Sequence, residues 1–140
     1  MSARYFLDTN IFVYSLDLTA PAKARRAATL IRDGLETGNG IVSYQVVQEF
    51  FNVAFRRFAQ PMSAFAAEEY LNTTFRPLLV VHSSPALFIS ALQVYAQHHL
   101  SWYDSLIVAA AQEAGCSVLY SEDMQHGQRV NHLRIENPFR

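Results

Sequence analysis

The stretch YFLDTNIFVYSLD, residues 5–17, contains three apolar or aromatic residues, then Asp8, Thr9 and Asn10, and then a second apolar run. An aspartate is unfavourable inside a β-strand, and its burial is costly unless it is paired, hydrogen-bonded or bound to a metal. One structural explanation is that Asp8, Thr9 or Asn10 caps a following helix, because these residue types are preferred at helix N-caps. The alternative is a functional charge at the end of a strand, and the rest of the sequence must decide between the two.

Composition limits the class of protein. The chain has 140 residues, 51% of them hydrophobic, and a formal net charge of -1. We therefore expect one domain, residues 1–140, with a buried core and no global attraction to nucleic acid or membranes. The single cysteine, Cys116, excludes an intramolecular disulfide and a cysteine-rich zinc site, and its apolar neighbours place it in the core. Neither a signal peptide nor a membrane-spanning run is visible, so we expect a cytoplasmic protein with no membrane association.

Short apolar runs alternate with longer stretches of helical periodicity. We expect strands at 4–8, 40–43, 77–83 and 116–123, and a last strand at the sheet edge at 133–137. Helices are expected at 21–38, 44–58, 84–100 and 101–115, and another begins at Ser63. Strands that alternate with long helices predict an α/β fold, a three-layer α/β/α sandwich with a mainly parallel central sheet.

This fold class would give four acidic residues a common location. In open parallel sheets the binding crevice lies outside the carboxyl ends of the strands. Asp8 ends the first expected strand, and Asp123 ends the strand at 116–123. Glu49 lies on the helix that follows the second strand, and Asp104 lies in the first turn of the helix at 101–115. We therefore expect all four carboxylates to face one rim of the sheet.

Each acidic residue also has a structural explanation. Glu49 shares its helix face with polar residues, which is the usual setting of a solvated glutamate. Asp104 follows Ser101 by three residues, as in a capping box, and Asp123 could stabilise a turn. The joint occurrence of four such residues at one predicted rim is less readily explained by separate structural roles.

Clustered carboxylates favour a particular chemistry. They repel one another and raise one another's pKa values unless a cation neutralises them. Hard oxygen ligands select Mg2+ or Mn2+, and such an ion can activate a water molecule and stabilise charge on a phosphodiester. The chain has neither a glycine-rich phosphate loop nor an HExxH zinc motif. The pattern therefore predicts metal-dependent hydrolysis of a phosphodiester.

Four motifs in this order resemble a known family. They are FLDTN at 6–10, VVQEFFN at 46–52, WYDSLIVAAA at 102–111 and LYSEDMQHG at 119–127. Together they resemble the PIN-domain ribonucleases, and most closely the VapC-type toxins of bacterial toxin-antitoxin pairs. The resemblance covers nearly the whole chain.

The resemblance implies a set of catalytic, metal-binding carboxylates, namely Asp8, Glu49, Asp104 and Asp123. It also implies that Asn10 and Ser121 are supporting residues that orient ligands or water. Glu122 stands next to Asp123, and spacing alone does not decide which of the two points into the site. We favour Asp123, because Ser121 matches the family's small hydroxyl residue two positions earlier.

The resemblance further implies an RNA substrate, a homodimer and a cognate antitoxin. Positive charge on two helices could contact a phosphate backbone or form solvated helix faces; the residues are Lys23, Arg25, Arg26, Arg32, Arg56 and Arg57. One group of phenylalanines exceeds what a helix pair in a small core needs, so part of it is expected at a partner surface. The group is Phe50, Phe51, Phe55, Phe58 and Phe65.

Two other functional classes remain open at this point. A binding module of the same fold would sequester RNA or a protein without cleavage, although such a module has no reason to keep crowded charges. A metal-dependent DNA nuclease or phosphatase would use the same carboxylates.

Overall fold

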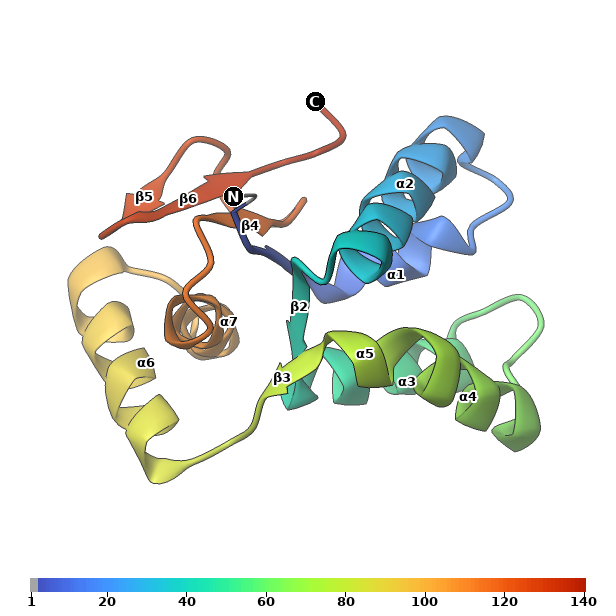
Figure 1. The fold of residues 1–140 in the computed structure, drawn as a ribbon, viewed down its shortest axis with the longest axis horizontal. Coiled ribbons are helices and arrows are strands. Elements are labelled where there is room, and N and C mark those ends of the chain that lie inside the picture. Colours follow the sequence, from blue (N-terminus) through green and yellow to red (C-terminus); the bar gives the residue numbers. More distant parts are fainter. Residues whose placement is uncertain (1–2) are drawn as a thin grey trace.

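The computed structural model describes residues 3–140, and in this part of the chain a six-stranded sheet is covered by helices on both faces (Figure 1). The strand order is β3-β2-β1-β4-β6-β5. Neighbouring strands are parallel, except that β5 pairs with β6 antiparallel. The strands are β1 (Tyr5–Leu7), β2 (Gly40–Ser43), β3 (Leu79–Val81), β4 (Val118–Tyr120), β5 (Arg129–Val130) and β6 (Leu133–Glu136).

The helices form two layers, with α6 and α7 on one face of the sheet and α1 to α5 on the other (Figure 1). Their bounds are α1 Thr9–Ser15, α2 Pro21–Thr37, α3 Tyr44–Arg56, α4 Ala64–Tyr70, α5 Arg76–Leu78, α6 Pro85–His98 and α7 Trp102–Glu113, with a π-helical turn, η1, at Leu71–Phe75. Within residues 3–140, none of these helices has the length and apolar character needed to cross a bilayer. The expected three-layer α/β/α fold with a mainly parallel sheet is confirmed.

Capping residues explain where several helices begin and end. The side chains of Ser63, Ser84 and Ser101 accept hydrogen bonds from backbone N–H groups at the starts of α4, α6 and α7. Gly38 ends α2 with a φ of 75°, a left-handed conformation that glycine adopts without strain. These boundaries lie close to those expected from the sequence.

The phenylalanine group divides between the core and the surface. Phe50 is fully buried, and Phe51 and Phe58 pack against the core at its edge. Phe55 and Phe65 are 45% and 74% exposed. Burial of the first three stabilises the packing of α3 and of the segment after it against the core, whereas the last two are exposed at the surface. Cys116 is buried, as expected.

Two local expectations were wrong, and one helix had been considered only through its cap. Residues 9–15 lie outside the helices and strands expected from periodicity, but they form α1 immediately after Asp8, as the capping explanation of Asp8 requires. The strand expected at 77–83 is shortened to β3, because the helical turn of α5 continues to Leu78. The strand expected at the edge, β6, lies between β4 and β5, and the two-residue strand β5 is the edge strand. So short a strand carries too few residues to show an alternating pattern.

Candidate active site

The site begins where β1 and β4 end. In the strand order, β1 lies between β2 and β4, so the sheet order reverses at β1, and such switch points open a crevice at the carboxyl ends of the strands. Leu7 pairs with Tyr120, which places Asp8 beside Ser121. The Ser121 hydroxyl donates a hydrogen bond to Oδ2 of Asp8 at 2.8 Å, and both side chains are buried.

Asp8 is both a helix cap and a member of an acidic group. Its Oδ1 accepts a hydrogen bond from the backbone N–H of Thr9 at 2.7 Å at the start of α1. Burial raises the pKa of Asp8 from 3.8 to about 6, opposed by the hydrogen bonds from Ser121 and Thr9. The negative charges of Glu49 and Asp104 raise this pKa further. The capping role and the acidic grouping are therefore compatible.

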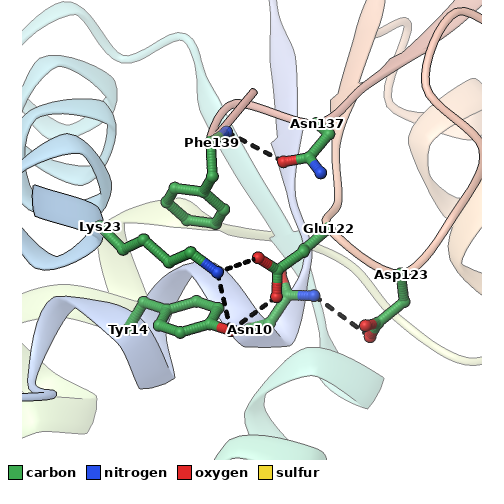
Figure 2. Close-up of polar contacts among 7 residues, drawn as sticks. All are labelled: Asn10, Tyr14, Lys23, Glu122, Asp123, Asn137 and Phe139. Atoms are coloured by element: carbon green, nitrogen blue, oxygen red, sulfur yellow. Dashed lines mark hydrogen bonds and ion pairs between the residues drawn. The ribbon is translucent and has the colours of Figure 1, made fainter. Parts of the chain in front are cut away.

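The first turn of α1 holds two further carboxylates. Thr9 Oγ1 donates to Oε1 of Glu49 at 2.7 Å, and Gln45 Nε2 donates to its Oε2 at 3.2 Å. Asn10 Nδ2 donates to Oδ2 of Asp123 at 3.2 Å (Figure 2). Thr9 and Gln45 were not among the residues singled out from the sequence. The available signals were the adjacency of Thr9 to Asp8 and the position of Gln45 one helical turn before Glu49.

Asp104 approaches the group from α7. Its backbone N–H donates to the Ser101 hydroxyl at 3.1 Å, so the expected cap is present. Burial raises the pKa of the Asp104 carboxyl group, a hydrogen bond to Ser101 lowers it, and the charges of Asp123 and Glu49 raise it. Asp8 and Asp104 thus each respond to the charge of Glu49, and the four carboxylates are linked electrostatically.

The donor set suits a hard divalent cation. Within residues 3–140, no lysine or arginine forms an ion pair with any of the four carboxylates. Oδ1 of Asn10 is buried without a hydrogen-bond partner, so an unused oxygen lies on a residue that already contacts Asp123. Carboxylate and amide oxygens are the ligands that Mg2+ and Mn2+ prefer.

The four carboxylates nevertheless lie too far apart to form a closed metal site. In the described part of the chain, no three acidic, histidine or cysteine side chains are grouped closely enough to hold an ion as they stand. Like charges repel, and an ion that removes this repulsion would favour their closer approach.

Glu122 points away from this group. Its Oε2 forms an ion pair with Nζ of Lys23 at 2.6 Å, and its Oε1 accepts a hydrogen bond from the Tyr14 hydroxyl at 2.6 Å (Figure 2). The structure thus places Asp123 beside Asn10 and Glu122 between α1 and α2.

The six basic residues considered for RNA contact lie on α2 and at the end of α3. Lys23 is engaged by Glu122, and Nε of Arg26 donates to the carbonyl oxygen of Pro138 at 3.3 Å. The remaining candidates are exposed; they are Arg25, Arg32, Arg56 and Arg57.

An open groove of about 870 Å³ leads up to the acidic group. Asn10 and Asp123 line it at one place, and Arg57 contributes a positive charge. Much of the remaining lining is apolar and includes Leu16 and Leu18, which are 43% and 95% exposed.

No curated protein matches the sequence significantly. Several solved structures share the fold, including these three. One is VapC20 of Mycobacterium tuberculosis, described as a sarcin-ricin loop cleaving toxin, with 20% identity, a TM-score of 0.59, and coverage of 85% of this chain and 89% of that one.

The second structure is FitAcB from Neisseria gonorrhoeae, with 18% identity, a TM-score of 0.62, and coverage of 96% of this chain and 98% of that one. The third is FitAB bound to an IR36 DNA fragment, with 17% identity, a TM-score of 0.67, and coverage of 97% and 96%. At these identities the likeness concerns the fold. The model of the PIN domain family matches residues 5–129, most of the chain, and the protein therefore belongs to the PIN domain family.

Proposed function

We propose that the protein is a metal-dependent endoribonuclease that hydrolyses RNA phosphodiester bonds and acts as the toxin of a toxin-antitoxin pair. The observation that carries this proposal is the electrostatic linkage of Asp8, Glu49, Asp104 and Asp123 at the carboxyl ends of parallel strands. Membership of the PIN domain family and the motifs shared with VapC-type toxins support it. VapC20, which shares the fold, is described as a sarcin-ricin loop cleaving toxin, and this description supports an RNA substrate here.

Each polar residue has a role in this proposal. The four carboxylates would hold Mg2+ or Mn2+, which supplies activation of water and stabilisation of charge on the phosphate when bound. Ser121 fixes one oxygen of Asp8. Thr9 and Gln45 orient Glu49, and Asn10 orients Asp123, so their hydrogen bonds set the directions in which the carboxylate lone pairs point.

Protein partners also belong to the proposal. The motif resemblance points to a cognate antitoxin and to a second copy of the chain. Two exposed apolar surfaces are available to partners, and larger patches of this kind mark interaction sites. One is the groove that contains Leu16 and Leu18. The other is the outer side of α6, where Phe88, Ile89, Leu92 and Tyr95 are 43% to 58% exposed.

The test is incubation of the purified protein with total RNA, with Mg2+, with Mn2+ and with chelator, followed by mapping of the cut ends. We expect metal-dependent cleavage that falls at least about a hundredfold in Asp8→Asn, because the variant lacks one charged ligand. Asp33→Asn, on an exposed part of α2, is the matched control and should cleave like the wild type. Equal cleavage by wild type and Asp8→Asn would contradict the assignment, and cleavage of DNA alone would favour the DNA nuclease.

A further inference from the structure

The loop that follows β4 docks on α1 through two successive carboxylates. Asn10 and Tyr14 lie four residues apart on α1, a spacing that puts both side chains on the same helix face. Asn10 donates to Asp123 at 3.2 Å, and Tyr14 donates to Glu122 at 2.6 Å (Figure 2). One face of α1 therefore holds both acidic residues of the loop.

Glu122 is the more firmly held of the two. Besides the Tyr14 hydrogen bond, it forms the 2.6 Å ion pair with Lys23 from α2. Nζ of Lys23 lies 4.6 Å from the centroid of the Tyr14 ring and 5.6 Å from that of Phe139. These rings pack edge to face with centroids 5.0 Å apart. The ammonium group is thus held by a carboxylate and by two aromatic rings, which strengthens a contact beyond that of a solvated pair.

Asp123 has much weaker support. Its side chain is exposed, and in the described part of the chain its one side-chain hydrogen bond comes from Asn10. A single hydrogen bond at 3.2 Å is a weak restraint for a group that must meet a metal ion accurately. Because adjacent residues share a peptide unit, a fixed Glu122 restricts the backbone of Asp123.

We propose that Glu122 is a positioning residue, held by Lys23 and Tyr14 so that Asp123 is presented to Asn10 and the other carboxylates. The functional part of this inference rests on the proposed function. It gives Lys23 a role other than contact with RNA: its charge anchors the loop.

The experiment compares Glu122→Ala, Lys23→Gln and the conservative Lys23→Arg with the wild type. The matched control is Glu136→Ala, which breaks the Arg134–Glu136 ion pair. That pair has an N–O distance of 2.8 Å, and its side chains are 43% and 29% exposed. The Lys23–Glu122 pair is similar, with a distance of 2.6 Å and exposures of 40% and 23%. The readouts are the Kd for Mn2+ by calorimetry, amide hydrogen exchange across residues 121–128, and kcat and KM on a short RNA.

We expect Glu122→Ala and Lys23→Gln to raise the Mn2+ Kd about tenfold, the effect typical of residues that orient metal ligands. Their loop amides should exchange faster, and kcat should fall with little change in KM. Lys23→Arg should restore most of the Mn2+ affinity, and Glu136→Ala should match the wild type in all readouts. If Glu122→Ala does not fold, Glu122→Gln removes the charge with little change in size.

Wild-type Mn2+ affinity and loop exchange in a folded Glu122 variant would overturn the inference. A salt-dependent rise in KM for Lys23→Gln, with unchanged loop exchange, would make Lys23 an RNA contact and overturn it as well. If the wild type neither binds Mn2+ nor cleaves RNA, the proposed function fails. Hydrogen exchange would still report on the anchor: faster loop exchange in both variants supports it, and unchanged exchange refutes it.

Discussion

Replacement of Asp8 by asparagine should stabilise the metal-free protein while it removes activity. Asp8 is 6% exposed, and the charges of Glu49 and Asp104 act on it in addition to burial. Asparagine keeps the shape of the side chain and removes the charge. The effect on the free energy of unfolding follows from the pKa of Asp8.

That pKa rises from 3.8 to about 6 in the folded protein. At about 1.4 kcal/mol per pH unit, the ionised carboxyl group destabilises the fold by about 3 kcal/mol above pH 6. The folded state binds this proton more tightly than the unfolded state, so stability falls as pH rises between the two pKa values and the loss is complete above the folded one. Asparagine sacrifices one of the two accepted hydrogen bonds, which costs about 1–2 kcal/mol.

The net gain should be about 1–2 kcal/mol near pH 8, or about 3–7 °C in Tm for a chain of this length. Near pH 5 the charge effect should be about half as large, because part of the wild-type Asp8 is then protonated. Thermal unfolding of wild type and Asp8→Asn in chelator, at both pH values, measures this difference. Asp33→Asn is the control, since the Asp33 side chain is 53% exposed and its ion-pair partner is the exposed Arg32 rather than an acidic group.

Divalent metal should reverse the order of the two melting temperatures, so that the wild type becomes more stable than Asp8→Asn. An ion that binds the folded state alone stabilises it by about 2.7 kcal/mol at a hundredfold excess over Kd, and the variant binds it less well. A Tm for Asp8→Asn equal to or below that of the wild type in chelator near pH 8 would refute the electrostatic reasoning. A wild-type Tm that ignores Mn2+ would refute the metal site.

Two further predictions concern activity in cells and the packing of α2. Expression of the wild type alone in bacteria should arrest growth, whereas expression of Asp104→Asn should not, because this variant lacks one acidic ligand. Growth curves at matched expression levels test this. Equal growth of both strains would contradict the toxin assignment. Gly34→Ala should lower the free energy of unfolding by about 1–3 kcal/mol, because its Cβ would lie 2.9 Å from Cα of Gly40. Denaturant unfolding measures this loss, with Glu36→Ala as the control variant at an exposed position of the same helix. An unchanged unfolding midpoint would contradict the prediction and show that α2 can shift away from β2.

Much of the fold followed from the sequence because long amphipathic helices and caps are local signals. The serines that start α4, α6 and α7 and the glycine that ends α2 lie where the sequence places them. Two short elements, α1 and β5, were not among the helices and strands expected from periodicity. α1 has seven residues and β5 has two, so neither contains enough periods for a pattern to emerge.

The candidate site shows the same division. Asp8, Glu49, Asp104 and Asp123 could be singled out because each stands at a predicted strand end or on an adjoining helix. Among their hydrogen-bond partners, Asn10 and Ser121 were expected as supporting residues, whereas Thr9 and Gln45 were not. Thr9 acquires its role only when residues 9–15 become helical. The pairing of Lys23 with Glu122 joins residues 99 positions apart, and no local pattern encodes such a contact.

The geometry of the acidic group depends directly on the packing of the core. Ile11 and Phe12 are fully buried on the apolar side of α1, whereas Thr9 and Asn10 contact carboxylates on its polar side. The Phe12 ring contacts that of Phe50 on α3, at a centroid distance of 6.5 Å. Phe50 follows Glu49 in the chain, so the same helix pair makes the core contact and the 2.7 Å hydrogen bond from Thr9 to Glu49. A shift of α1 along α3 would disturb both contacts, and tight core packing resists such a shift. The burial of the apolar face of α1 thus sets the positions of Thr9 and Asn10, which contact the carboxylates of Glu49 and Asp123.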